Sequence, residues 1–258
     1  MTLFEAVVLG VIQGLSEFLP VSSSGHLLAF QHLFGIREED NLTFMIALNM
    51  GSLVPLLWVF RGDLLALLKN PFQKLAGLLA LSVLPVVAVT ALFLGRIEAM
   101  FQMADYLWAG FVVTGVLLLL SERLGRGGRG LGDLGARDAL LVGLVQAFAV
   151  FPGLSRSGST IVAGLWRGLD KESAAKFSFL MSIPTAFGAV ALRIANMLAG
   201  RLDPGSLDFA NLSAGFLAAA VAGYFSINAM LAIVKKAKLK YFALYYIAAL
   251  VALLLLFA

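Results

Sequence analysis

The chain has 258 residues, of which 60% are hydrophobic and 13% charged, and its formal net charge is +4. Globular soluble domains carry about 25% charged residues, so this composition and a mean hydropathy of +0.94 exclude a soluble domain and a nucleic-acid-binding module. Because the chain contains no cysteine, disulfide and thiol chemistry are excluded as well.

The first predicted element, residues 1–36, is an apolar stretch broken by ionisable and hydroxyl groups. It contains Glu17, the consecutive serines 22–24 and His26, and Pro20 interrupts its helical pattern. Ionisable groups at membrane depth are expensive, so each is a candidate functional residue. A broken helix at that depth is tolerated only against protein or a watery cavity. We therefore predict a re-entrant helical hairpin and, since a basic leader is lacking, expect it to remain in the mature protein.

The long apolar segments that follow are predicted to cross the membrane, since each comes near the roughly 20 residues that span the hydrocarbon core. They are residues 41–60, 75–95, 105–121, 172–199, 209–234 and 241–258. Basic residues gather in the connections 61–74, 123–137, 167–176 and 235–240. Cytoplasmic loops are the ones rich in Lys and Arg. If these connections are cytoplasmic, consecutive spans can cross the membrane in opposite directions on one condition. Residues 1–36 and residues 138–170 must each enter and leave the membrane on the same side.

The connection between the two halves, residues 122–137, is rich in glycine and arginine, and we expect it to be a flexible cytoplasmic linker. The second re-entrant element, 138–170, carries Arg156 mid-way through an uncharged stretch. At this position the side chain is a poor candidate for snorkelling to the membrane interface. Arginine presents a fixed fork of donors that matches phosphate oxygens. An arginine facing serines, a histidine and a glutamate indicates a phosphate site with acid–base chemistry.

A shift of 133 residues places the first polar segment on the second. The matched pairs are Gly10 and Gly143, Gln13 and Gln146, Phe18 and Phe151, Ser22 and Ser155, Ser24 and Ser157, Gly25 and Gly158, Gly35 and Gly168, and Phe44 and Phe177. Three membrane crossings separate equivalent points of the two copies, so the second copy has the reverse orientation in the membrane. In such folds the two broken elements meet near the midplane of the bilayer. We predict an all-α polytopic membrane protein with an inverted-topology repeat, 1–121 and 138–258, each half a re-entrant hairpin plus three transmembrane helices. Chance similarity among apolar helices is the alternative.

The hydroxyl groups of these segments have two interpretations. Ser22 and Ser24 suit a helix N-cap, whereas the free N–H groups at such helix starts bind anions. His32, on an apolar helical face, is interpreted as structural or interfacial, and Arg193 as lying near a span end.

Two motifs resemble the signatures of one family. They are Gln13-x-x-x-Glu17-Phe-Leu-Pro-Val-Ser-Ser-x-Gly-His26 and Pro152-Gly-x-Ser-Arg-Ser-x-x-Thr160, with support from residues 48–53 and 175–184. The chain is similar, over essentially its whole length, to the bacitracin-resistance type of undecaprenyl-diphosphate phosphatases. The resemblance implies a multi-pass enzyme of the bacterial inner membrane, with its site facing the periplasm. It implies removal of the terminal phosphate of undecaprenyl diphosphate, recycling of the carrier lipid for cell-wall synthesis, and bacitracin resistance.

Carried over position by position, the resemblance implies catalytic roles for Glu17, Ser23, His26 and Arg156. Substrate-binding roles are expected for Gln13, Ser22, Ser24, Gly153, Ser155, Ser157 and Thr160. Family members carry Glu or Gln at the position of Gln13. Since only Glu17 remains of that carboxylate pair, a divalent cation (magnesium or calcium) is expected to be weakly held by it or to arrive on the diphosphate.

Phosphoryl transfer needs positioning and charge neutralisation. We hypothesise that Arg156 and the hydroxyls near it hold the diphosphate and that Ser23 is the nucleophile. His26 would act as base and then acid, and Glu17 would orient it or hold the cation. Attack by His26 itself or by water stays open. The alternative function is an inverted-repeat transporter or lipid flippase. The expected partners are the polyprenyl diphosphate substrate and membrane lipids, without nucleic acid, and a homodimer is left open.

Overall fold

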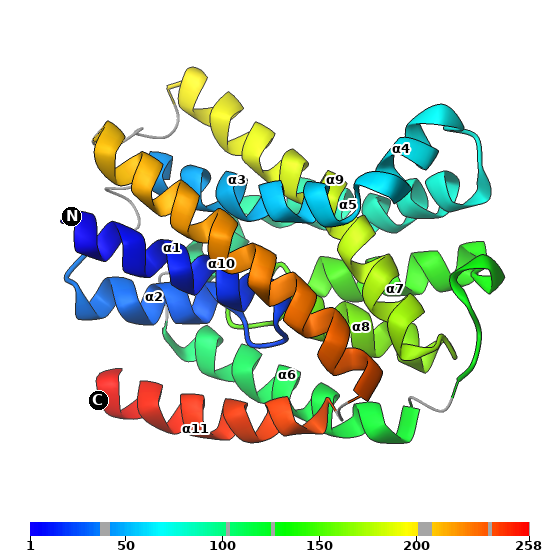
Figure 1. Cartoon of the computed structure of the whole chain (residues 1–258). Helices are drawn as coiled ribbons and strands as arrows, with labels where there is room; N and C mark the ends of the chain where they lie inside the picture. Colours follow the sequence, from blue (N-terminus) through cyan, green and yellow to red (C-terminus); the bar gives the residue numbers. More distant parts are fainter. Residues whose placement is uncertain (37–41, 102–103, 125–126, 201–207, 237–238, 258) are drawn as a thin grey trace.

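The structure, a computed structural model, describes residues 1–36, 42–101, 104–124, 127–200, 208–236 and 239–257. Every regular element within these ranges is helical (Figure 1). The elements are α1 (Leu3–Phe18), α2 (Ser23–Leu33), α3 (Leu42–Val59), α4 (Arg61–Lys69), α5 (Lys74–Phe101), α6 (Ala104–Leu124), the 3-10 turn η2 (Leu131–Asp133), α7 (Ala136–Phe148), α8 (Arg156–Trp166), α9 (Lys171–Leu198), α10 (Phe209–Lys236) and α11 (Lys240–Phe257).

Two short helical hairpins meet near the centre of the molecule. The turn 19–22 joins α1 to α2, and the turn 149–155 joins α7 to α8. In Figure 1 the first hairpin reaches the middle from the left and the second from the right. Pro20 cannot continue a helix, and Gly153 has a φ of 79°, a conformation that favours glycine. These breaks turn the chain back at mid-molecule, so that the two tips face each other.

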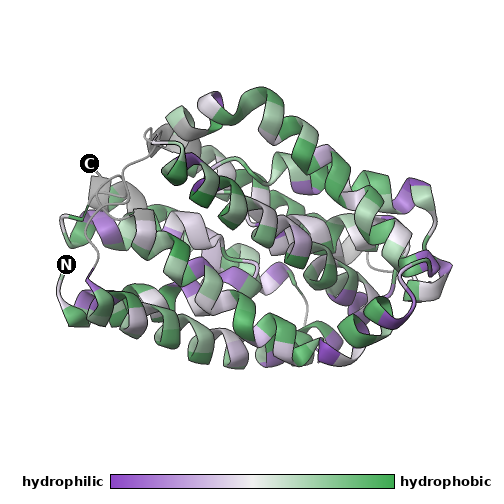
Figure 2. Ribbon diagram, turned by 90° about the horizontal axis from the view of Figure 1, so that it is seen from above, coloured by the Kyte–Doolittle hydropathy of each residue, from purple (hydrophilic) through white to green (hydrophobic). Residues whose placement is uncertain are grey.

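The predicted fold class, an all-helical membrane protein, is confirmed. Each predicted span overlaps one helix, α3, α5, α6, α9, α10 or α11, and the predicted end residues 41 and 258 lie outside the described ranges. Among the described residues, three helices are long and apolar enough to cross a membrane: Lys74–Ile97, Lys171–Leu198 and Phe209–Lys236. α3 joins them when it is counted with α4, an unpredicted helix that follows a bend of 76°. Figure 2 shows hydrophobic residues along most of the helices. The inverted orientation of the two halves stays a prediction.

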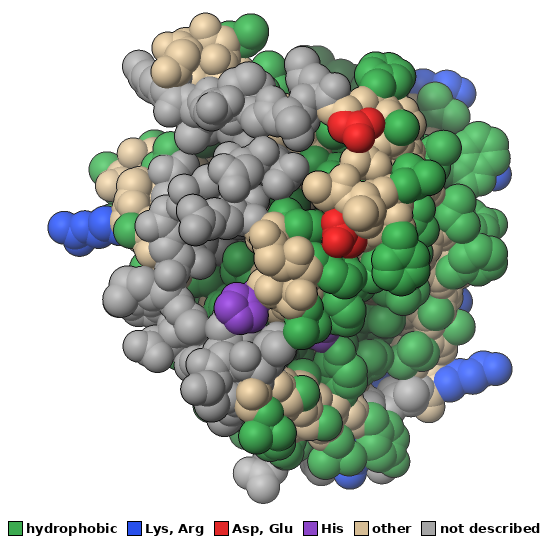
Figure 3. Space-filling view, turned by 90° about the vertical axis from the view of Figure 1, so that its left-hand side faces the viewer, with side chains coloured by type: hydrophobic (Ala, Val, Ile, Leu, Met, Phe, Trp, Pro, Cys, Tyr) green, Lys and Arg blue, Asp and Glu red, His purple; other side chains and the backbone are tan. Residues whose placement is uncertain are grey.

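The distribution of basic residues agrees with the predicted sidedness. The basic connections 61–74 and 127–135 lie at the right in Figure 1, opposite the end at which the first hairpin opens. Figure 3 shows that opposite end, where acidic and histidine side chains lie among hydrophobic ones and Lys and Arg project at the margin. If the basic connections are cytoplasmic, the first hairpin opens on the non-cytoplasmic side.

Small residues let α1 pack closely on α10. A Cβ added to Gly14 would lie 2.4 Å from the carbonyl oxygen of Ala219, and one added to Gly10 would lie 2.4 Å from that of Gly215. Membrane helices commonly associate through such close backbone approach. The contact fixes α1, and with it the side chains of its last turn, against the long helix α10.

Residues 127–135 of the predicted linker make specific contacts with the second hairpin, and the flexibility of the linker stays a prediction. The backbone N–H of Arg129 donates to the carbonyl of Gly168 at 3.1 Å, and its guanidinium donates to Asp138 at 2.8 Å. Arg167 donates to the same carboxylate at 2.7 Å. Burial raises the pKa of Asp138, but hydrogen bonds, led by the one from Arg129, lower it to about 2. The ionised carboxylate thus ties the linker to the turn between α8 and α9.

We expect Asp138→Asn to lower the melting temperature of the detergent-solubilised protein by about 2–8 °C, because it deprives Arg129 and Arg167 of their carboxylate. Glu172→Gln is the matched control. Glu172 and Lys235 form a 3.0 Å ion pair with side chains 59% and 52% exposed, and such pairs contribute little. Equal melting temperatures for the two variants, measured by intrinsic fluorescence, would contradict this role of Asp138.

Candidate active site

The two hairpin tips contact each other through backbone and hydroxyl groups. Ser157 Oγ donates to the carbonyl oxygen of Leu19 at 3.0 Å. The Gly153 N–H donates to Ser24 Oγ at 3.4 Å. Both contacts join residues from different halves of the chain. The two polar segments that the sequence singles out therefore meet in the structure.

Glu17, in the last turn of α1, lies at the centre of the site. Its Oε1 accepts a hydrogen bond from the guanidinium of Arg156, with which it forms an ion pair. Its Oε2 accepts hydrogen bonds from Ser23 Oγ at 2.7 Å and from Gln13 Nε2 at 3.2 Å. The side chains of Glu17 and Arg156 are 15% and 26% exposed. One carboxylate thus brings together three of the other predicted site residues.

The start of α8 is fixed from within the protein. Arg156 is the first residue of this helix, so its charge lies beside the positive end of the helix dipole. The hydroxyl of Thr160 donates to the carbonyl of Arg156 at 2.7 Å and lies 2.6 Å from Ser178 Oγ on α9. The Ser155 N–H donates to Thr114 Oγ1 on α6 at 3.0 Å. These contacts fix the start of α8, from which the guanidinium reaches Glu17. Thr160 supports this helix start through its hydroxyl.

Two of the hydroxyls predicted to bind substrate are helix caps. Ser22 Oγ accepts the Gly25 N–H at 3.4 Å, and Ser155 Oγ accepts the Gly158 N–H at 3.1 Å. Ser22 also has a φ of 68°, the only positive value at a non-glycine residue in the described part of the chain. Backbone strain of this kind costs about 1–3 kcal/mol and clusters at functional sites. Here it lies directly beside Ser23.

Asn49 and Ser52 on α3 are neighbours of the site for which the sequence predicted no role. Gln13 Nε2 lies 3.4 Å from Asn49 Oδ1 and 3.4 Å from Ser52 Oγ. Asn49 Nδ2 donates to the carbonyl of Met45 at 2.8 Å, which fixes the orientation of its amide. An amide and a hydroxyl within one turn of a predicted membrane span were the signal that could have found them.

The contacts of His26 differ from the hypothesised mechanism. Its Nδ1 lies 2.7 Å from the carbonyl oxygen of Ser22, and its Nε2 contacts the hydroxyl of Tyr245 on α11. Ser23 is hydrogen-bonded to Glu17, so Glu17 holds the hydroxyl itself rather than orienting the imidazole. The physical reason is that the ring folds back onto the carbonyl one turn earlier, at the strained start of α2.

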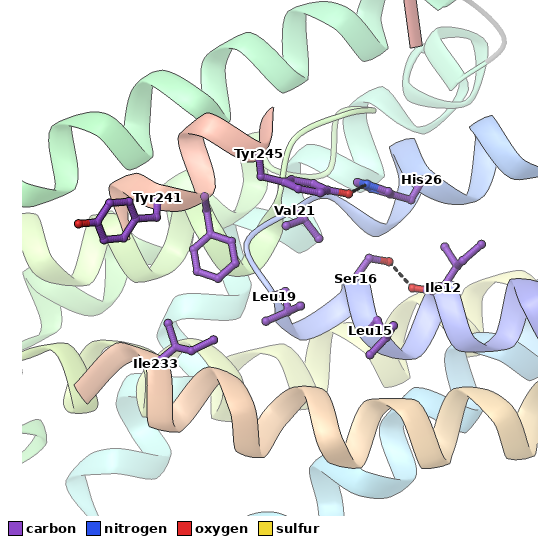
Figure 4. A pocket seen from close by; sticks show the side chains of 10 residues that line it. Ile12, Leu15, Ser16, Leu19, Val21, His26, Ile233, Tyr241 and Tyr245 are labelled. Atoms are coloured by element: carbon purple, nitrogen blue, oxygen red, sulfur yellow. Dashed lines mark hydrogen bonds between the residues drawn. The ribbon is translucent and has the colours of Figure 1, made fainter. Parts of the chain in front are cut away.

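An apolar cavity of about 600 Å³ borders this part of the molecule. It lies between α1, the turn after it, the end of α10 and the start of α11, and the His26–Tyr245 contact stands at its edge (Figure 4). Its apolar walls include Ile12, Leu15, Leu19, Val21, Ile233 and Phe242. A long hydrocarbon chain would find matching surface there.

The side chains around Glu17 do not supply the oxygen ligands that a divalent cation would need if it were held by the protein alone. Calcium takes roughly 6–8 oxygen ligands, and magnesium also requires oxygen ligands. Both oxygens of Glu17 already accept hydrogen bonds, from Arg156, Ser23 and Gln13. Within the described ranges, no group of three or more His, Cys, Asp and Glu side chains is placed to hold a metal ion.

Gln13→Ala is expected to lower phosphate release from a polyprenyl diphosphate about tenfold, because Glu17 loses a hydrogen bond that orients it. Gln146→Ala is the matched control at the equivalent position of the other half. Gln146 is 2% exposed, and neither of its amide atoms has a hydrogen-bond partner in the described structure. The control should stay within about twofold of the wild type. An equal loss in both variants, at equal melting temperature, would show that Gln13 has no specific role.

The chain matches the family model described as "Bacitracin resistance protein BacA" over residues 6–252. An undecaprenyl-diphosphatase of Carboxydothermus hydrogenoformans is 41% identical over 245 residues, covering 95% of this chain and 94% of the relative. Undecaprenyl-diphosphatase 4 of Bacillus thuringiensis subsp. konkukian is 40% identical over 245 residues, covering 95% and 93%. An undecaprenyl-diphosphatase of Methanobrevibacter smithii is 39% identical over 269 residues, covering 95% and 94%. The resemblance inferred from the two motifs is confirmed, and the chain belongs to the bacitracin resistance protein BacA family.

Proposed function

We propose that this protein is a membrane phosphatase that hydrolyses undecaprenyl diphosphate to undecaprenyl phosphate and inorganic phosphate. Its similar relatives carry the name undecaprenyl-diphosphatase. The reaction regenerates the carrier lipid for cell-wall synthesis and confers bacitracin resistance. The observation that carries the chemical assignment is the cluster of Glu17, Ser23 and Arg156 where the two halves of the chain meet.

Arg156 is the residue that binds the terminal phosphate in this proposal. A guanidinium matches phosphate oxygens with paired hydrogen bonds, and a helix start favours anions. In the structure Arg156 is paired with Glu17. The diphosphate competes with that carboxylate for the guanidinium, while Glu17 keeps the hydrogen bond from Ser23.

Ser23 Oγ then attacks the terminal phosphorus, and its proton passes to Glu17 Oε2, 2.7 Å away. The bond from that phosphorus to the bridging oxygen breaks, and the bridging oxygen leaves on undecaprenyl phosphate, taking the proton from Glu17. Water next attacks the phosphoserine and gives a proton to Glu17, which returns it to Ser23 as inorganic phosphate leaves. Glu17 thus replaces His26 as the group that accepts the serine proton. Direct attack by water, with Ser23 as a phosphate ligand, is the alternative.

The apolar cavity beside His26 is the proposed place for the first part of the polyprenyl chain. We place the protein in the bacterial inner membrane with its site open to the periplasm, since the first hairpin opens away from the basic connections. A transporter or flippase would also use two broken helices. It would have no need of a serine held by a carboxylate beside an arginine, so the phosphatase is favoured.

Arg156→Ala is expected to reduce phosphate release by the purified protein in detergent roughly 10³-fold, since the charge that stabilises the transferring phosphoryl group is lost. Ser23→Ala should cause a comparable loss. Arg61→Ala is the matched control, because Arg61, the first residue of α4, lies over the ring of Trp58 on α3, and α4 is far from the hairpin tips (Figure 1). Detergent abolishes vectorial transport but permits hydrolysis, so wild-type phosphate release also excludes a pure flippase. Near-wild-type activity of folded Arg156→Ala would refute the site.

Chelation should remove activity without destabilising the protein, because we propose that the divalent cation arrives on the diphosphate. With excess EDTA, phosphate release is expected to fall while the melting temperature of the substrate-free protein changes by less than about 1 °C. Added magnesium or calcium should restore turnover. A large drop in the melting temperature on chelation would instead indicate a cation resident in the protein.

A further inference from the structure

We infer that Tyr245, on α11, is a positioning residue that holds the imidazole of His26 and, through it, the turn that presents Ser23. The inference rests on the proposed function, since it concerns the same site. Tyr245 belongs to neither motif and lies 219 residues from His26 in the sequence. It nevertheless contacts the imidazole through both its hydroxyl and its ring.

The hydrogen bonds of His26 define the state of the ring. A carbonyl oxygen can only accept, so His26 Nδ1, 2.7 Å from the carbonyl of Ser22, carries a proton and donates it. In the neutral ring Nε2 then has a free lone pair, and the hydroxyl of Tyr245 donates to it. The phenol and the carbonyl therefore select one tautomer and one orientation of the imidazole.

Aromatic packing holds the ring in the same orientation. The ring centroids of Tyr245 and His26 are 5.6 Å apart, with an angle of 17° between the ring planes. The ring centroid of Phe111, on α6, lies 5.9 Å from that of His26, with an interplanar angle of 31°. A Cβ added to Gly25, just before the histidine, would lie 2.2 Å from the Phe111 ring. Three helices thus form a slot for this side chain, and among the described residues Tyr245 alone adds a polar contact from outside the first hairpin.

The location of the contact gives it a role in the reaction. His26 and Tyr245 both line the apolar cavity, and their hydrogen bond lies at its edge (Figure 4). The carbonyl that holds Nδ1 belongs to Ser22, the strained residue that precedes Ser23. Tyr245 therefore fixes the imidazole at the edge of the proposed lipid path and, through it, supports the turn that presents Ser23.

The test is Tyr245→Phe, which keeps the aromatic ring and removes only the hydroxyl. Diethyl pyrocarbonate acylates an unprotonated imidazole nitrogen, which the phenol covers in the wild type. We expect acylation of His26, followed by peptide mass spectrometry, to become about threefold to tenfold faster in Tyr245→Phe. The rate at His32, in the same sample, should not change. Tyr224→Phe makes the same substitution on α10 outside the cavity and should leave the rate at His26 unchanged.

Turnover of a polyprenyl diphosphate provides the second readout. Tyr245→Phe should lower kcat about threefold to tenfold with little change in KM, because the phenol orients a site residue without holding substrate. An unchanged acylation rate at His26 would overturn the contact, and an unchanged kcat would overturn its role in the reaction. If the wild type released no phosphate, the proposed function would fail while the acylation rates still decided whether Tyr245 covers Nε2.

Discussion

The ion pair between Glu17 and Arg156 is the interaction on which the rest of the structure depends. Each half of the chain contributes one of the two charges, and each charge lies at the tip of a short hairpin surrounded by apolar helices. A charged side chain at membrane depth is costly without a partner, and removal of one partner leaves the other uncompensated. The pair therefore joins the two hairpins. Backbone contacts of Leu19 and Gly153 at the tips keep the charged groups within reach of each other.

Close backbone packing explains how hairpins of such short helices stay in place. On α1, Gly14 leaves no room for a methyl group against Ala219, and on α7 a Cβ added to Gly143 would lie 2.2 Å from the carbonyl oxygen of Ser82. A larger side chain at either position would push the helix away from its neighbour and shift the tip that carries the site. Small residues thus control the geometry of the charges from a distance of one or two helical turns.

Much of the fold could be predicted because its signals are local. Apolar length alone indicated the long helices, and polar groups in apolar surroundings indicated both Glu17 and Arg156. The pairings inside the site could not be predicted, since Ser23 reaches the carboxylate only because the preceding turn adopts a strained conformation. Tyr245 was missed because nothing in its own segment distinguishes it from other interfacial tyrosines. The contacts of Arg129 in the linker could not be predicted, because they depend on Gly168 and Asp138, which lie elsewhere in the sequence.

The ion pair between Glu17 and Arg156 also prepares the proposed reaction. A neutralised Arg156 costs less to hold among apolar helices than a free cation would. A diphosphate offers more charge and more acceptor oxygens than one carboxylate, so it is a strong competitor for the guanidinium. In the proposed reaction the guanidinium turns to the phosphate, and Glu17 keeps the hydrogen bond from Ser23, which is 2.7 Å long in the structure. The carboxylate that pairs with Arg156 is therefore also the group placed to accept the serine proton in that proposal.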